Sequence, residues 1–183
     1  KANGKPRGNN LLWLARWKVE KVAAEVIHVA QRPKTTVDMY GDTAIIGDTR
    51  YRDYCMSLAD GLFARANPGV SREIAVDLLS THKALLLWLN WEEPLGLIPL
   101  EAMACGAVPI VSNRGAIPET VKHGETGFIV NTIDEMEGLI RRDAVKEINL
   151  DTMRKHVEEN FSTKKFVEDW EKLLTKVAEG ERW

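Results

Sequence analysis

The fold is decided by residues 84–112, which read Ala84-Leu-Leu-Leu-Trp-Leu-Asn90-Trp-Glu-Glu93-Pro-Leu-Gly96-Leu-Ile-Pro-Leu-Glu101-Ala-Met-Ala-Cys-Gly106-Ala-Val108-Pro-Ile-Val-Ser112. Residues 84–89 are continuously apolar, as a strand buried on both faces requires. Residues 97–104 then predict a helix that ends at a glycine, and residues 108–112 predict a second apolar strand. This order indicates a β-α-β unit with parallel strands.

The same alternation continues on both sides of this segment. The remaining strands are expected at residues 11–15, 35–40, 61–66 and 127–130, and the helices at 20–32, 51–59, 70–80, 118–122, 133–142, 149–160 and 163–179. About six buried strands separated by helices predict an α/β fold, a doubly wound, Rossmann-like parallel sheet with helices on both faces. Residues 1–10 are polar and contain Gly and Pro, so we expect a linker or disordered arm before a domain at 11–183.

Composition excludes several classes of protein. The 183 residues suit one domain, and no apolar run approaches the roughly 18–20 residues that cross a bilayer. Only Cys55 and Cys105 are present, too few for a disulfide framework or a four-cysteine metal site. A net charge of -2 argues against a dedicated nucleic-acid binder. The chain opens on Lys1 without a leader, so we expect a fragment or processed start and a cytoplasmic location.

Positive charge gathers near the start of the chain. Residues 1–34 hold eight Lys and Arg against two Glu. Arg16 follows the first strand and Lys21 lies in the first turn of the predicted helix, so both can face the crevice at the carboxyl ends of the strands. Two cations at a helix start suit a diphosphate. The alternative is that both are solvated or paired with Glu20 and Glu25.

The first strand lacks the glycine motifs of nucleotide-dependent dehydrogenases and P-loop phosphotransferases. Both classes need glycines for close backbone approach to phosphate, so both are disfavoured. No Asp-x-Asp motif occurs either, so the sequence does not require a divalent metal.

Two glutamates flank the start of the helix at 97–104. Glu93 lies in the preceding loop, and Glu101 follows eight residues later on the helix. Gly96 allows close approach of a ligand, and the amides of Leu97 and Ile98 lie at the positive end of the helix dipole. Carboxylates in these places can accept hydrogen bonds from sugar hydroxyls. The alternative is that both glutamates are ordinary surface or paired residues.

These motifs together resemble a known family. The run from Glu93 to Gly106, with residues 107–112 and Gly115-Ala-Ile-Pro-Glu119, is similar to the donor-binding half of GT-B retaining glycosyltransferases of the GT4 family. The hallmark is a glutamate, seven residues and a second glutamate. Arg16 and Lys21, the turn at 40–42 and the strand at 124–130 extend the resemblance to about residues 11–179.

The resemblance implies a role for each site residue. Arg16 and Lys21 are expected to bind the donor diphosphate and to offset the charge that develops on this leaving group. Glu93 is expected to bind hydroxyls of the donor sugar, and these three residues form the expected catalytic set. Glu101 is expected to hold the ribose hydroxyls of the nucleotide.

Backbone groups complete the expected donor site. Gly96 and the amides of Leu97 and Ile98 are expected to hold the sugar or phosphate. Gly41, in the turn after the second strand, is expected to belong to the same donor-binding site. The expected ligand is a UDP-, GDP- or ADP-sugar. An N-terminal acceptor-binding domain outside this chain would be needed for turnover, and any peripheral membrane contact would be made through that half.

The sequence leaves two rival functions open. Ala15, Leu95 and Ala116 replace residues common in the family, which favours a non-catalytic nucleotide-binding or interaction module with a degenerate GT-B half-fold. A different GT-B enzyme, such as a sugar-nucleotide epimerase or a phosphorylase, is the second rival. It is disfavoured because the glutamate pair and the Arg/Lys pair match the transferase pattern together.

Overall fold

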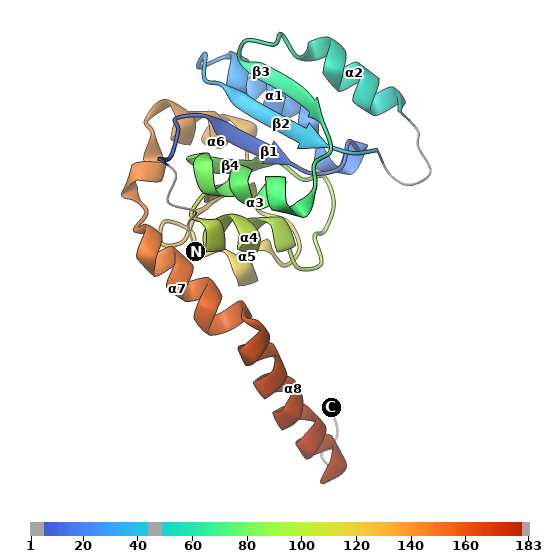
Figure 1. The fold of residues 1–183 in the computed structure, drawn as a ribbon, viewed down its shortest axis with the longest axis vertical. Coiled ribbons are helices and arrows are strands. Elements are labelled where there is room, and N and C mark those ends of the chain that lie inside the picture. The colour runs from blue at the N-terminus through green and yellow to red at the C-terminus, as the bar shows by residue number, and fades with distance from the viewer. Residues whose placement is uncertain (1–5, 44–48, 181–183) are drawn as a thin grey trace.

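The computed structural model describes residues 6–43 and 49–180 (Figure 1). Six strands form one parallel sheet in the order β3-β2-β1-β4-β5-β6. The strands are β1 (Leu11–Leu14), β2 (Val37–Gly41), β3 (Ala64–Pro68), β4 (Ala84–Leu87), β5 (Val108–Ser112) and β6 (Phe128–Val130). The predicted doubly wound α/β fold is therefore confirmed.

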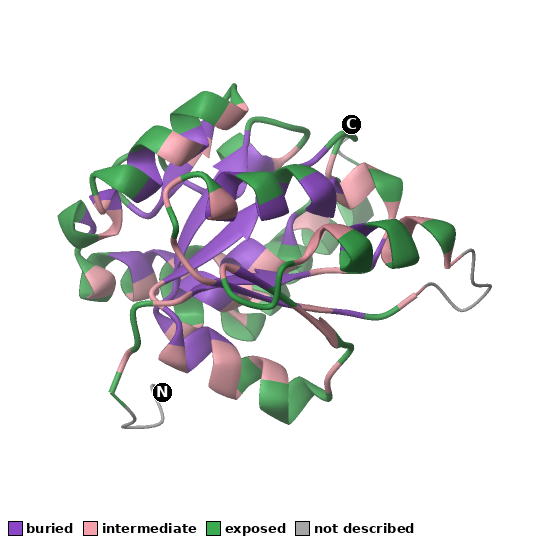
Figure 2. Ribbon diagram, turned by 90° about the horizontal axis from the view of Figure 1, so that it is seen from above, coloured by how far each residue is buried: buried purple, intermediate pink, exposed green. Residues whose placement is uncertain are grey.

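Helices cover both faces of this sheet. They are α1 (Ala23–Gln31), α2 (Arg50–Leu58), α3 (Arg72–Thr81), α4 (Leu97–Cys105), α5 (Ile117–Thr120), α6 (Ile133–Arg141), α7 (Leu150–Phe161) and α8 (Thr163–Ala178), with short 3₁₀ turns η1 (Val19–Lys21) and η2 (Ala144–Glu147). On one face α3 and α4 pack against Leu12, Leu14 and Leu85. On the other face α1 packs against Trp13 and Met39. Strands β1, β4 and β5 between these layers are wholly buried (Figure 2), whereas β3 at the edge of the sheet is only partly buried.

The third strand begins later than the sequence predicts. It was expected at 61–66 and is found at Ala64–Pro68. The carboxylate of Asp60 accepts hydrogen bonds from the amides of Leu62, Phe63 and Ala64, which folds residues 60–63 into a turn. A side-chain turn of this kind competes with the extended strand conformation.

A crevice opens where the strand order reverses. β1 pairs with β4 only through Leu11 with Ala84 and Leu12 with Leu85. The chain leaves β1 toward β2 and β3 on one side, and leaves β4 toward β5 and β6 on the other. Among residues 6–43 and 49–180, no crossover therefore covers the carboxyl ends of β1 and β4, which is the usual place for a ligand in such sheets.

Residues just before β1 are attached to the domain. The Arg7 guanidinium donates to the carbonyl oxygens of His82 (2.8 Å) and Cys105 (3.2 Å), and the Gly8 amide donates to Thr81 (2.7 Å). Residues 7 and 8 thus bind the carboxyl ends of α3 and α4, although residues 1–10 were expected to form a linker or disordered arm. Residues 1–5 lie outside the described residues, so the division at residue 10 stays a prediction.

Helix α8 extends away from the sheet (Figure 1). Ser162 caps its start by accepting a hydrogen bond from the Lys165 amide. None of its residues is buried, and Phe166, Trp170 and Leu174 are all exposed. No helix within the described residues is long and apolar enough to cross a membrane.

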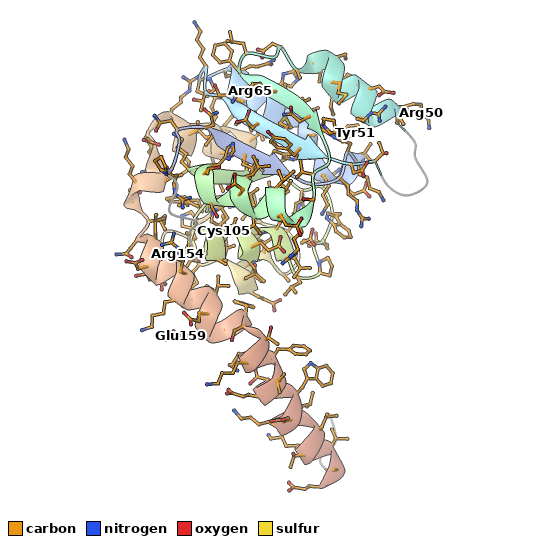
Figure 3. All side chains as sticks on the ribbon, in the orientation of Figure 1. Arg50, Tyr51, Arg65, Cys105, Arg154 and Glu159 are labelled. Atoms are coloured by element: carbon orange, nitrogen blue, oxygen red, sulfur yellow. The ribbon has the colours of Figure 1, made fainter. Side chains whose placement is uncertain are left out.

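A buried carboxylate ties the amino-terminal part of the sheet together. Asp38 in β2 forms two hydrogen bonds with Arg65, which lies on β3 (Figure 3), and contacts His82 Nε2 at 3.0 Å and Asn10 Nδ2 at 3.0 Å. Burial by itself raises the pKa of Asp38. The hydrogen bonds from His82, Arg65 and Asn10 outweigh burial and lower this pKa to about 2.

We predict that Asp38→Asn destabilises the domain by about 2–4 kcal/mol near neutral pH, because Arg65 and His82 lose a charged partner. The ionised Asp38 contributes its full stability above the unfolded pKa of about 4, and that contribution is lost as pH falls toward about 2. The stability difference between parent and variant should therefore narrow over this range. Urea unfolding at several pH values measures it.

Asp134→Asn is the matched control for this prediction. Its side chain is 86% exposed and its ion pair with Arg32 spans 3.5 Å, so a change of less than about 0.5 kcal/mol is expected. Equal losses in the two variants would contradict the role given to Asp38.

Candidate functional site

A cavity of about 690 Å³ lies at the carboxyl ends of β1, β2 and β4. Leu14 and Leu87 contribute apolar surface to it, at the ends of the two strands between which the order reverses. Its charged lining includes Arg16, Lys21 and Glu93. The structure thus brings together the three residues that the sequence assigned to one crevice.

Lys21 and Glu93 form an ion pair inside this cavity. The Lys21 Nζ and Glu93 Oε2 atoms are 2.7 Å apart, and the two side chains are only 18% and 13% exposed. The Lys21 ammonium also lies 4.6 Å from the centroid of the Trp91 ring, within range of a cation–π interaction. Lys21 is therefore neither solvated nor paired with Glu20 or Glu25, the alternatives that the sequence left open.

Backbone hydrogen bonds fix the two loops that bear this pair. The Asn90 amide donates to the Glu20 carbonyl at 3.0 Å, which joins the loop after β4 to η1. The Ala116 amide donates to the Glu93 carbonyl at 2.7 Å, and the Gly115 amide donates to Glu92 Oε2 at 2.6 Å. The loop after β5 therefore supports the backbone of Glu93 from the other side.

The backbone at Lys21 departs from the sequence prediction of one helix over 20–32. Lys21 ends η1, Val22 then adopts a left-handed conformation with φ of 43°, and α1 begins only at Ala23. A positive φ is unfavourable for a β-branched residue, and such strain is commonest at functional sites. This break sends Lys21 toward Glu93 rather than along α1.

The amino end of α4 borders the cavity without a side-chain cap. Gly96 precedes the helix with φ of 82°, and no side chain accepts a hydrogen bond from the first turn. The first turn holds no acidic residue, and Pro99 has no N–H group. Gly96, Leu97 and Ile98 all line the cavity, so the amides of Leu97 and Ile98 are placed to bind an anion.

Arg16 and Gly41 also line the cavity, from the ends of β1 and β2. Arg16 is exposed, and it has no ion-pair partner within the described part of the chain. A Cβ on Gly41 would lie 2.2 Å from the Ala15 carbonyl oxygen, and Trp17 Nε1 donates to the Gly41 carbonyl at 2.9 Å. Close packing of β2 against the loop after β1 therefore already requires a glycine here.

Glu101 lies apart from the other predicted site residues. Its Oε1 accepts a hydrogen bond from the Arg72 guanidinium at 2.8 Å, and Glu101 is not among the residues that line the cavity. It stands one turn beyond Ile98 on α4, beside the wall that α3 forms. Its predicted contact with ribose stays a prediction.

Two lining residues carried no expectation from the sequence. Gly69 and Val70 line the cavity from the loop after β3, whereas Asp42 belongs to the turn at 40–42 that the family resemblance included. Their position directly after a strand was the available signal for Gly69 and Val70. Trp91 also lines the cavity, and its contact with Lys21 depends on a loop geometry that a sequence pattern does not specify.

Comparison with known proteins identifies the family of this chain. A family model described as "Glycosyl transferases group 1" matches residues 2–157. The chain belongs to this family. The GT4 resemblance drawn from the two glutamates and the Arg/Lys pair is thereby confirmed.

Two curated relatives align with about half of the chain. The chain is 32% identical over 105 residues to the N-acetyl-alpha-D-glucosaminyl L-malate synthase of Bacillus anthracis, which covers 54% of this chain and 27% of that enzyme. It is 37% identical over 101 residues to granule-bound starch synthase 1 of Pisum sativum, covering 45% of the chain and 16% of the relative. The chain therefore spans well under half of these relatives.

Solved structures share the fold. AviGT4, a glycosyltransferase involved in avilamycin A biosynthesis, matches with a TM-score of 0.84 at 20% identity, covering the whole chain and 55% of AviGT4. Anabaena HepE in complex with UDP and glucose matches with a TM-score of 0.79 at 18% identity, covering 91% of this chain and 48% of HepE. The fold is thus the C-terminal, Rossmann-like half of the GT-B architecture, as the sequence predicted.

We predict that Gly115→Ala disturbs the Glu93 loop. A Cβ there would lie 2.3 Å from the Glu93 carbonyl oxygen and 2.4 Å from its amide nitrogen, and φ is 56°. The variant should lose about 2–5 kcal/mol of unfolding free energy, combining left-handed strain with overpacking. Thermal and urea unfolding measure this loss.

Gly124→Ala separates the two causes. Gly124 also has a positive φ, of 76°, but a Cβ there meets nothing within 4 Å. Only the backbone strain of about 1–2 kcal/mol is expected. A loss as large as that of Gly115→Ala would show that contact with Glu93 is not the cause.

Proposed function

We propose that this chain binds the nucleotide-sugar donor of a retaining glycosyltransferase that moves a sugar from a nucleoside diphosphate to an acceptor. One observation carries the proposal. A single cavity is lined by three cations, among them Arg16 and Lys21, by an uncapped helix start and by the largely buried carboxylate of Glu93, where the strand order reverses. A diphosphate linked to a sugar offers the complementary groups in one molecule.

The diphosphate is assigned to Arg16, Lys21 and the amides of Leu97 and Ile98. Cations and helix amino ends both stabilise phosphate oxygens. When the bond to the sugar breaks, negative charge grows on the departing phosphate, and fixed positive groups favour that state over the ground state. Arg16 and Lys21 are therefore the residues to which we assign leaving-group stabilisation.

The sugar is assigned to Glu93 and the ribose to Glu101. Glu93 lines the cavity beside the helix start, where a sugar attached to the phosphate would lie. Glu101 lies farther along α4, where it pairs with Arg72 of α3. Gly41 completes the site through its backbone beside Arg16.

Turnover is assigned to this chain together with a second, acceptor-binding domain. The chain spans about half of the glycosyltransferase structures it matches. The exposed apolar residues of α8, among them Phe166 and Trp170, offer surface for such a domain. We predict that residues 1–183 alone transfer no measurable sugar, and robust transfer by this chain would refute that. The cytoplasmic location stays a prediction.

Calorimetric titration with UDP, GDP and ADP tests the binding function and identifies the base. HepE was solved with UDP and with UDP-glucose, so uridine nucleotides are the first choice. Weak but saturable binding of at least one nucleotide is expected. A folded chain that binds none of the three would favour the non-catalytic interaction module instead.

We predict that Glu101→Ala weakens binding of that nucleotide by about 1–3 kcal/mol, the size of hydrogen bonds to a charged group. Glu125→Ala is the control because Glu125 lies on a distant loop and pairs only loosely with Lys122, at 3.8 Å. Arg72→Ala, which removes the partner of Glu101 but leaves its carboxylate, should weaken binding less. Unchanged affinity in Glu101→Ala would remove the ribose assignment.

A further inference from the structure

Lys21 and Glu93 neutralise each other in the structure. Their 2.7 Å ion pair is largely shielded from water, at 18% and 13% exposure. The proposed function gives the two residues different ligands, the diphosphate for Lys21 and the sugar for Glu93. Neither can take up its ligand fully while the two are bonded to each other.

We propose that this ion pair makes recognition of the sugar conditional on the diphosphate, an inference that rests on the proposed function. The diphosphate carries at least two negative charges and competes with one carboxylate for the Lys21 ammonium. Once the diphosphate has bound the Lys21 ammonium, the Glu93 carboxylate is free to bind the sugar. A free sugar meets a Glu93 that is already occupied.

The surrounding contacts restrict this exchange to the side chains. The Asn90 amide holds the Glu20 carbonyl, and the Ala116 amide holds the Glu93 carbonyl, so neither backbone has to move. The Trp91 ring remains against the Lys21 ammonium after Glu93 has left. Trp91 is thus a positioning residue that keeps Lys21 in the cavity when its anionic partner changes.

Arg16 is suited to make the first contact with the anion. It is exposed at the same cavity and, within the described residues, has no ion pair to break. Electrostatic attraction to an open cation brings the diphosphate next to Lys21, where the exchange follows. Arg16 therefore contacts the diphosphate before Lys21 does, although both cations bind the same ligand.

The exchange also makes the site bind the intact donor more favourably than the nucleoside diphosphate that remains after transfer. A nucleoside diphosphate without the donor sugar releases Glu93 from Lys21 but supplies no donor-sugar hydroxyls to Glu93 in return, and a largely buried carboxylate without partners is unfavourable. The intact donor supplies those hydroxyls. After transfer, Glu93 regains Lys21, which favours release of the nucleoside diphosphate.

Glu93→Gln tests the competition with inorganic pyrophosphate as the probe. Pyrophosphate needs neither the base nor the sugar site, so the result does not depend on which nucleotide binds. The variant should bind pyrophosphate about tenfold more tightly than the parent in calorimetry, because Lys21 no longer has a charged competitor. Equal or weaker binding by a folded Glu93→Gln, or no binding at all, overturns the proposal.

Glu20→Gln is the matched control. It removes one negative charge from the same cavity, but Glu20 pairs with Lys18 at 3.5 Å and not with Lys21. A much smaller gain in pyrophosphate affinity is expected. A gain equal to that of Glu93→Gln would assign the effect to net charge and overturn the ion-pair exchange.

Two further measurements separate this inference from the proposed function. The parent should bind UDP-glucose more tightly than UDP, and Glu93→Gln should lose most of that difference; equal affinities in the parent would overturn the conditional step. If the parent binds no nucleotide, the donor function fails while the pyrophosphate comparison still decides the exchange.

In the parent itself, the NMR signal of the Glu93 carboxyl carbon should shift on pyrophosphate binding. An unmoved signal at saturation overturns the proposal even if the variant does not fold.

Discussion

Parallel strands need crossover helices, and in this sheet the crossovers diverge on either side of β1 and β4. The site depends on that divergence. It places the loop after β1, with Arg16 and Lys21, beside the loop after β4, with Glu93. Residues 72 positions apart in the sequence thereby form one ion pair. The amino end of α4 joins them because α4 starts from the same loop.

Three glycines maintain this arrangement for different reasons. Gly96 supplies the left-handed conformation that starts α4 at the cavity. Gly115 allows the loop after β5 to lie directly on the backbone of Glu93, and Gly41 allows β2 to approach the carbonyl of Ala15. In two of the three positions the glycine serves contact between backbone segments. Such a residue can lie in a binding motif without touching a ligand.

Apolar runs and helix ends predicted most of the fold. Strand β5 has the predicted limits, and α8 begins at the predicted residue, Thr163. The later start of β3 depends on the Asp60 carboxylate, and the break after Lys21 depends on a left-handed Val22. Both are local side-chain or backbone choices that apolar periodicity does not encode.

The sequence also grouped Arg16, Lys21 and Glu93 correctly at one crevice. It could not show that Lys21 pairs with Glu93, or that Glu101 turns toward Arg72, because those contacts depend on rotamers across neighbouring loops.

The attachment of Arg7 has a mechanical consequence for the cavity. Its guanidinium joins the carboxyl ends of α3 and α4, and the opposite, amino-terminal parts of the same helices border the cavity. Two helices fastened at one end separate at the other by rotation about the fastening rather than by sliding past each other. A rotation of α3 against α4 about this attachment would therefore change the width of the cavity between their amino ends. Tension applied to the chain just before β1 would act on that rotation from the far side of the sheet.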